Sequence, residues 1–187
     1  DKYREVLIES VAETSEEFLD RYLEGDEFSI TEISAALATN VQEGSVVPVC
    51  MGSPVDLMGV ANLLDDIVGY FPSPNERSCN GLDQKTNEIF EANYDFGKAK
   101  SAYIFKTIVD PFLGKYSMIK VSSGVIKNDD VLYNVQKDSE EKLNKLYVLE
   151  GNKPQEVTEL HAGDIGAIGK LVKSSTGDTL ATKAHPV

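Results

Sequence analysis

A glycine-containing turn follows a short apolar run in the first half of the chain. The run covers residues 46–51 and ends at Gly52, Ser53 and Pro54. Backbone N–H groups in a turn are not consumed by a sheet ladder, so they can face the carbonyl oxygen of a ligand. Glycine allows close backbone approach, whereas Pro54 has no N–H and removes one donor. The same residue types also fit an ordinary strand-to-helix turn.

The stretch 163–170 carries three glycines and a closing lysine, but its spacing does not make a phosphate-binding loop. Such a loop needs the pattern GxxxxGK[ST], because backbone amides and a lysine must balance the phosphate charge and a hydroxyl must reach magnesium. Leu171 follows Lys170 here, and the pattern occurs nowhere in the sequence. The Asn-Lys-x-Asp guanine pattern is also missing, and we interpret the Asp-x-x-Gly match at 56–59 as chance. We therefore expect no catalytic residue, no metal site and no bound nucleotide within these residues.

Other chemistries have little support in the residue types. Cys50 and Cys79 are the only cysteines, and we interpret both as free thiols rather than a disulfide. Two distant histidines without clustered cysteines make no plausible zinc site. His161 is interpreted as structural, and adjacent carboxylates are interpreted as caps and turns rather than acid–base pairs.

The net charge of −13 is unevenly divided along the chain. Residues 1–74 contain 15 acidic and 3 basic side chains, a net charge of −12, and residues 75–187 contain 16 and 15, a net charge of −1. Nucleic-acid binding driven by bulk charge is therefore disfavoured, because counterion release needs clustered Lys and Arg. Contact with structured RNA through a few side chains remains compatible with this composition. No apolar run approaches the ~18 residues of a membrane span.

The first part of the chain is predicted to be mainly helical. Apolar residues recur at helical spacing over 3–24, with an interruption that indicates two helices, and Gly25 is a natural stop. A capping box opens a shorter helix over about 29–37, and another helix is predicted at about 59–70. With 46–51 as a short buried strand, this order is typical of the closing edge of an α/β layer.

The pattern changes to short strands after residue 101. Each strand is bounded by turn residues such as Ser123-Gly124 and Gly151-Asn152, and this spacing predicts a small closed β-barrel. The predicted strands are 102–109, 115–122, 130–135, 142–149 and 164–173.

Several turn signals of this region occur in a fixed order that identifies a family. They resemble domain II of translational GTPases, most closely elongation factor G and its paralogs. The matching words are Asp110-Pro111-Phe112-Leu113-Gly114-Lys115, Ser123-Gly124-Val125-Ile126-Lys127, His161-Ala162-Gly163-Asp164-Ile165-Gly166-Ala167-Ile168-Gly169-Lys170-Leu171 and Thr176-Gly177-Asp178-Thr179-Leu180.

The resemblance implies a fold in two parts. Residues 1–74 are similar to the C-terminal segment of a GTPase domain, an α/β remnant of helices plus a short strand at the closing edge of a P-loop GTPase. Residues 75–97 match weakly and are interpreted as a linker. Residues 98–187 are similar to the antiparallel β-barrel of the translation-protein domain II type. By the same resemblance, Gly52, Ser53 and Pro54 are a remnant of the guanine-facing turn.

The resemblance also implies a role in translation. The parent protein would bind GTP or GDP with magnesium and hydrolyse GTP through a part outside these residues, while acting on the ribosome in the cytoplasm. Its domain II would contact small-subunit RNA, and no membrane or DNA partner is expected. An exposed sheet edge in the first part could pair in an oligomer. The candidate phosphate contacts are Lys115, Lys120, Lys127 and Lys173.

Two alternatives stay open at this point. The words around residues 160–168 are similar to the second-type elongation factor G paralogs, and tetracycline-resistance ribosomal protection proteins share the superfamily. A free-standing, non-catalytic barrel that binds RNA or protein is the other alternative. A phosphate-binding loop upstream in the reading frame would favour a GTPase.

Overall fold

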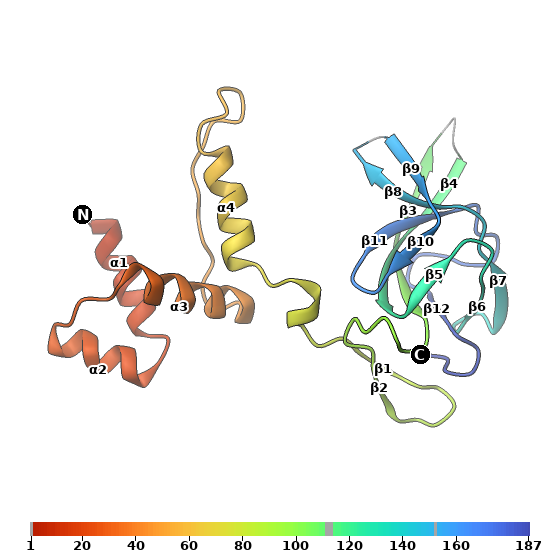
Figure 1. Ribbon diagram of the computed structural model, residues 1–187, viewed down its shortest axis with the longest axis horizontal. Helices are drawn as coiled ribbons and strands as arrows, with labels where there is room; N and C mark the ends of the chain where they lie inside the picture. The colour runs from red at the N-terminus through yellow and green to blue at the C-terminus, as the bar shows by residue number, and fades with distance from the viewer. Residues whose placement is uncertain (1, 111–113, 152) are drawn as a thin grey trace. The chain divides into compact units, whose positions relative to one another are not determined.

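The computed structural model describes residues 2–110, 114–151 and 153–187, and it divides into two compact units, 1–73 and 74–187 (Figure 1). Each unit is built from a different kind of secondary structure. The first contains helices, and the second is almost entirely antiparallel β-structure. The predicted order of helices followed by β-structure is confirmed.

Four helices make up the first unit: α1 (Lys2–Ala12), α2 (Glu16–Glu24), α3 (Ile30–Glu43) and α4 (Val60–Tyr70). The predicted break between two N-terminal helices is confirmed. The N-cap of α2 is Ser15, whose side chain accepts the Phe18 N–H at 3.1 Å. The helix predicted over 29–37 is longer than expected and continues to Glu43, where Gly44 adopts a left-handed conformation and ends it. A small core holds α1, α2 and α3 together: Val11, Ala12, Phe28, Ile33 and Ala36 are buried in it.

The start of α3 is fixed by two reciprocal hydrogen bonds. Ser29 accepts the Glu32 N–H at 3.3 Å and the Glu32 carboxylate accepts the Ser29 N–H at 2.8 Å, which confirms the predicted capping box. Arg21 on α2 reaches the same carboxylate at 2.7 Å. Its guanidinium also lies 5.1 Å from the centroid of the Phe28 ring, so one cation links α2, α3 and the connection between them.

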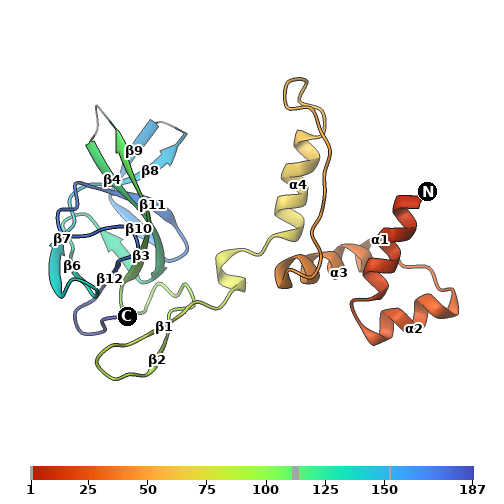
Figure 2. The ribbon, with the colours of Figure 1, turned by 180° about the vertical axis from the view of Figure 1, so that it is seen from behind.

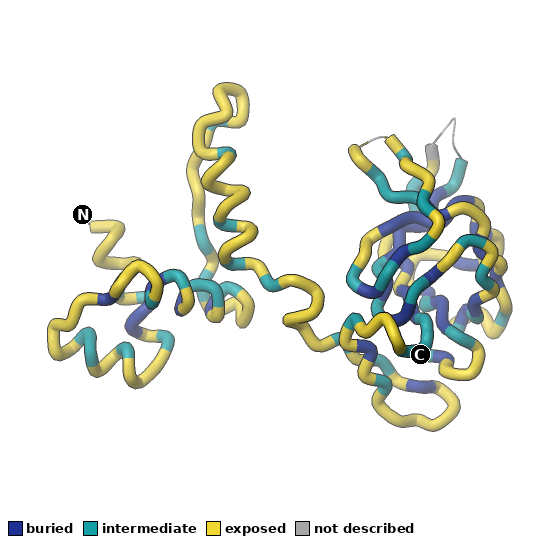
Figure 3. The backbone as a smooth tube through the Cα atoms, viewed as in Figure 1, coloured by how far each residue is buried: buried dark blue, intermediate teal, exposed yellow. Residues whose placement is uncertain are grey.

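The predicted buried strand at residues 46–51 is wrong. These residues form no strand, and Val47, Val49 and Met51 are 77%, 86% and 92% exposed. A strand requires a neighbour for its N–H and C=O groups, and the described part of the chain provides none for this segment. The segment returns to α4 through a turn, and most of the returning chain is exposed (Figure 3).

The second unit has one large sheet with the strand order β7-β6-β12-β3-β4-β11-β8-β9 and antiparallel pairing throughout. Figure 2 shows the same strands from behind. The strands are β3 (Ser101–Asp110), β4 (Gly114–Ser123), β6 (Val131–Asn134), β7 (Ser139–Lys142), β8 (Leu146–Glu150), β9 (Lys153–Val157), β11 (Ile165–Gly169) and β12 (Thr179–Ala181). A separate pair consists of β5 (Val125–Lys127) and β10 (Glu159–His161).

The predicted closed barrel is not formed by the described residues. The edge strands β7 and β9 pair with β6 and β8 alone, so the sheet has two free edges. The strands β5 and β10, which could have bridged these edges, bond to each other instead. Leu160 of β10 and Ile126 of β5 are nevertheless buried in the same core as the side chains of the large sheet. Side-chain packing, and not a continuous ladder of backbone hydrogen bonds, thus connects this strand pair to the large sheet.

Most of the strand predictions are confirmed, but one predicted strand covers parts of two strands. The predicted strand 142–149 is in fact the end of β7 and the start of β8, which flank a break at residues 143–145. Residues 111–113 and 152 lie outside the described part of the chain, and with them part of the Asp110–Lys115 signal and of the turn at 151–152.

The segment predicted as a linker, residues 75–97, lies within the second unit. It begins at a short 3₁₀ turn, η1 (Pro74–Glu76), and contains the hairpin β1 (Asn80–Leu82) and β2 (Ile89–Glu91). Backbone hydrogen bonds attach it to the sheet: Tyr94 N–H donates to Ser122 C=O at 3.1 Å and Gly124 N–H donates to Asp95 C=O at 2.8 Å.

These attachments predict the behaviour of two fragments. A fragment 74–187 should fold alone, and 98–187 should fold with a lower melting temperature, because it loses the hairpin and its bonds to the sheet. Circular dichroism melts of the two fragments measure the difference. Equal melting temperatures would show that residues 74–97 contribute nothing to the unit.

The Glu32 carboxylate gives a pH-dependent prediction. Hydrogen bonds from Arg21, then from Ser29, lower the pKa of Glu32 from its ordinary 4.5 to about 2. Because the folded pKa lies below the ordinary value, the stabilisation is complete above about pH 4.5 and disappears as the pH falls toward 2. An NMR titration should place the Glu32 pKa below 3, and Arg21→Gln should raise it toward 4.5. Arg4→Gln, outside this cluster, is the control and should leave the pKa of Glu32 unchanged.

Candidate functional site

The turn at residues 52–54, which the sequence analysis identified as a candidate site, is present and is closed by hydrogen bonds. The Ser53 N–H donates to the Met58 carbonyl oxygen at 3.0 Å, and the Ser53 hydroxyl donates to the Asp56 carboxylate at 2.8 Å. Ser53 is half-buried, whereas Gly52 and Pro54 are exposed. The Ser53 amide is therefore already used inside the turn, and Pro54 has no N–H to offer.

Glycine is required at two facing positions of this turn. A Cβ on Gly52 would lie 2.7 Å from the Met58 carbonyl oxygen, and a Cβ on Gly59 would lie 2.9 Å from the Met51 carbonyl oxygen. Gly59 also has a φ of +77°, where glycine carries no steric cost. The two backbone segments thus approach each other more closely than any side chain would permit.

An apolar groove runs beside this turn. It has a volume of about 460 Å³ and lies between residues 48–54 and one side of α4, with Met58, Leu63, Ile67 and Phe71 among its walls. Its polar members are few. The Cys50 thiol donates to the Asp66 carboxylate at 3.0 Å, and this hydrogen bond, with burial, raises the pKa of Cys50. Cys50 is consequently held as a thiol, which disfavours a role as nucleophile or metal ligand.

The four lysines proposed as phosphate contacts are not brought together. Two donate to carbonyl oxygens: Lys115 to Ser174 at 3.2 Å and Lys173 to Glu140 at 3.1 Å. Lys127 pairs with Glu159 at 3.3 Å. Lys120 lies 5.0 Å from the centroid of the Tyr94 ring. Each cation therefore has a local partner, and no basic cluster results.

The glycine-rich stretch forms a corner of the sheet. Gly163 has a φ of +95°, and the Asp164 carboxylate accepts the His161 N–H at 2.8 Å. Asp178 does the same at the next corner, where it accepts the Ser175 N–H at 2.8 Å. Both aspartates therefore have a structural role at these corners. The His161 ring packs against Phe96, with ring centroids 5.4 Å apart, which is consistent with a structural role.

A buried polar network links these corners to the sheet, and the sequence did not indicate it. The Asn134 amide donates to the Ser174 hydroxyl at 2.8 Å and to the Asp178 carboxylate at 2.9 Å. Glu141 in turn accepts the Ser174 hydroxyl at 2.8 Å and the Val172 N–H at 2.7 Å. Asn134 is fully buried, and Asp178 and Glu141 are nearly so. The polar residue types at buried positions of β6 and β7 carried no motif that would have revealed this network.

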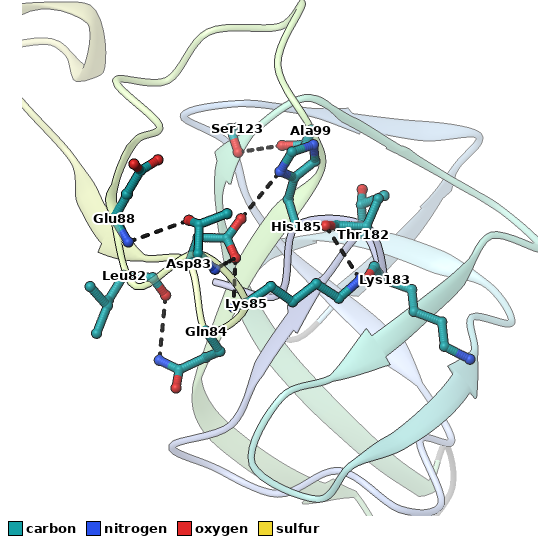
Figure 4. Close-up of polar contacts among 12 residues, drawn as sticks. Leu82, Asp83, Gln84, Lys85, Glu88, Ala99, Ser123, Thr182, Lys183 and His185 are labelled. Carbon is teal, nitrogen blue, oxygen red and sulfur yellow. Dashed lines mark hydrogen bonds and ion pairs between the residues drawn. The ribbon is translucent and has the colours of Figure 1, made fainter.

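A second contact missed by sequence reasoning joins the hairpin to the last residues of the chain (Figure 4). The Asp83 carboxylate faces His185 Nδ1 at 3.2 Å and accepts the Lys85 N–H at 2.8 Å. Hydrogen bonds from the Lys85 amide and then His185 lower the pKa of Asp83 against the effect of burial. Lys85 Nζ donates to the Lys183 carbonyl oxygen at 2.6 Å. These contacts tie residues 83–85 to 183–185.

Among the described residues, no group of three or more His, Cys, Asp or Glu side chains is arranged to hold a metal ion. In the same part of the chain, no helix has the length and apolar character to cross a membrane.

Comparison with known proteins identifies a family for residues 99–183 of the second unit. The family model described as "Elongation factor G domain 2" matches residues 99–183. The crystal structure of a protein from Thermus thermophilus is similar over all of this chain, with 29% sequence identity and a TM-score of 0.71. The chain spans 26% of the length of that protein.

The buried network predicts the cost of losing one amide. Asn134→Ala should destabilise the second unit by about 1–3 kcal/mol, because Asp178 and Ser174 lose their donor in a buried setting. Asn144→Ala is the matched control: this exposed amide has no hydrogen bond with the described residues, so the change should stay within about 0.5 kcal/mol. Urea unfolding of fragment 74–187 measures both, and equal effects would rule out a stabilising network.

Proposed function

We propose that this chain is an elongation factor G-like member of the translational GTPase family and works in a protein that acts on the ribosome during polypeptide elongation. Residues 99–183 match the family model of elongation factor G domain 2, which supports this proposal. In this proposal, residues 1–73 close a GTPase domain and residues 74–187 are domain II. GTP or GDP with magnesium binds, and GTP is hydrolysed, in a part outside these residues. The observation that carries the proposal is the match of the second unit to domain 2.

The exposed apolar surface of the first unit supports the assignment of residues 1–73. Val47, Val49 and Met51 lie in an extended segment without a strand partner, and Val68 and Phe71 at α4 are 86% and 55% exposed. An apolar surface of this kind is typical of an interaction site. Further strands of a GTPase domain would satisfy the backbone of 46–51 and cover α4.

The turn at residues 52–54 is the proposed remnant of the guanine-facing loop. Gly52 and Gly59 bring the backbone into a close arrangement that a Cβ would disrupt. Because Ser53 N–H is used within the turn and Pro54 has no N–H, guanine contact would depend on the donors that remain in adjacent residues. The sequence contains no phosphate loop, so this turn alone provides too little for nucleotide binding.

The proposal predicts a difference between this chain and a longer protein that includes its upstream sequence. Calorimetry should detect no micromolar GDP binding by residues 1–187, and micromolar binding by the longer protein. Ribosomes should stimulate GTP hydrolysis by the longer protein and should sediment with it. A longer protein that neither binds GDP nor sediments with ribosomes would overturn the proposal, and micromolar GDP affinity of residues 1–187 would contradict the assignment of the missing pocket.

A pair of glycine substitutions tests the role of the turn in the longer protein. Gly52→Ala should weaken GDP binding at least about tenfold, because its Cβ would meet the Met58 carbonyl oxygen at 2.7 Å and displace the turn. Gly69→Ala on α4 is the control, since a Cβ there meets no atom within 4 Å. Titration calorimetry should show unchanged affinity for the control. Equal GDP affinity in both variants would remove this turn from the nucleotide site.

A further inference from the structure

The hairpin formed by β1 and β2, near the start of the second unit, is too small to be stable by itself. Its strands pair over three residues each, from Asn80 opposite Glu91 to Leu82 opposite Ile89. Leu82 and Ile89 are exposed, so the hairpin buries little apolar surface. An isolated two-stranded hairpin is marginally stable at best in water. Its stability must therefore come from contacts with other segments.

Two hydrogen bonds to backbone carbonyl oxygens join the hairpin loop to the end of the second unit. The Gln84 N–H donates to Pro186 at 2.8 Å, and Lys85 Nζ donates to Lys183 at 2.6 Å. The second bond connects residues that are 98 positions apart in the chain. These bonds therefore link a segment near the start of the unit to a segment at its end.

A polar contact, a ring contact and a close backbone approach complete this junction (Figure 4). Asp83 is almost fully buried, and its carboxylate lies 3.2 Å from His185 Nδ1. The His185 ring also stacks on Phe90 of β2, with ring centroids 6.4 Å apart. A Cβ on Gly81 would overlap Val187 Cγ1, so only glycine permits this approach. The final segment of the unit therefore lies against the hairpin.

The same segment is attached to the large sheet at Thr182. The Thr182 N–H donates to the Lys100 carbonyl oxygen at 2.9 Å, and the Lys100 N–H donates to the Thr182 hydroxyl at 3.0 Å. Lys183 also pairs with Glu140 of β7 at 2.6 Å. Both of these side chains are exposed, and a surface ion pair contributes little to stability. The hairpin is thus the main support of the residues that follow Thr182.

We propose that residues 81–85 and 183–187 form a clasp that opens and closes as one unit while the large sheet stays folded. Local opening occurs where few apolar contacts are buried and backbone hydrogen bonds lie near solvent. Because the hairpin and the final segment stabilise each other, the loss of contacts on either side releases both. Opening frees the start and the end of the second unit together, with Thr182 as the hinge. This conformational device goes beyond the proposed function, which does not require it.

The clasp also forms one wall of a hollow of about 680 Å³ in the second unit. Gln84, Lys85, Lys183 and Pro186 line this wall, and another wall comes from β6, β7 and the turn between them. The closed clasp therefore limits access to the hollow from one side, and the open clasp removes this limit.

Amide exchange of the whole ¹⁵N-labelled chain, followed by NMR, tests whether the clasp opens as a unit. Gln84 and Asn87 in the hairpin loop and His185 in the final segment have hydrogen-bonded amides. These three amides should show the same protection, and it should be lower than that of Ile104 and Val121 in the large sheet. Protection equal to that of the sheet would overturn the proposal, because the clasp would then open only when the whole unit unfolds.

Substitutions on the two sides of the clasp test whether each side depends on the other. Lys85→Gln removes a hydrogen bond on the hairpin side, and it should raise the exchange rate of the His185 amide about fivefold. His185→Ala acts from the final segment and should raise the exchange rate of Asn87 by a similar factor. Glu91→Gln and Lys137→Gln are the matched controls, because both side chains are exposed and have no ion pair within the described residues. Neither control should change these rates.

The thiol of Cys79 provides a second measurement that does not depend on amide exchange. Cys79 precedes β1 and lines a hollow of about 400 Å³ together with Val187, so release of Val187 uncovers one side of this half-buried thiol. Its reaction with a small thiol reagent should become several-fold faster in Lys85→Gln and in His185→Ala. Cys50, an exposed thiol in the first unit, is the internal control and should react at an unchanged rate.

Circular dichroism of both variants should confirm that the fold is kept. An unchanged reaction rate of Cys79 in both variants would overturn the proposal. Amide exchange that changes only in the segment carrying the substitution would also overturn it, because the two sides would then open independently.

Discussion

The pairing of β3 with β4 is the interaction on which the second unit depends. The two strands run antiparallel from Ser101 opposite Ser123 to Asp110 opposite Gly114, and they occupy the centre of the large sheet, with β12 on one side and β11 on the other. Their inner face supplies Ile104, Ile119 and Val121, none of which is exposed. Two register shifts along the pair increase the local twist. A twisted central pair lets the outer strands curve around one core, even though the edges never bond to each other.

The same requirement for backbone partners explains the contrast between the two units. In the second, the ends of the large sheet are completed by side chains, as Glu141 does for the amides of Val172 and Lys173. In the first, residues 46–51 have apolar side chains and an extended backbone but no strand to join within the described chain. The two units thus differ in how far their own residues provide partners for backbone N–H and C=O groups. A helical unit with an unpaired extended segment, followed in the chain by a unit of antiparallel β-structure, is compatible with the proposed function.

How much of this structure the sequence could predict depends on how far apart in the chain the interacting residues lie. Helix caps are local, so Ser29, Glu32 and Gly25 could be assigned from neighbouring residues. Strand positions could be predicted from turn residues and their spacing, but strand partners could not. Barrel closure depends on which strands meet across the core, and β5 bonds β10, a strand distant in the chain. The Asn134–Asp178 network and the Asp83–His185 contact also join distant segments, and no local pattern distinguishes these residues from others of their type.

Electrostatics limits how the second unit can recognise an anionic partner. Residues 75–187 have a net charge of −1 and many of their lysines are paired locally, so they produce no strong positive field. Residues 1–74, with a net charge of −12, repel phosphate within a Debye length of about 8 Å at physiological salt. If the second unit contacts RNA, the contact would therefore have to depend on shape and on a few side chains. Because few counterions would be released, such binding would depend only weakly on salt, unlike the charge-driven binding of a basic domain.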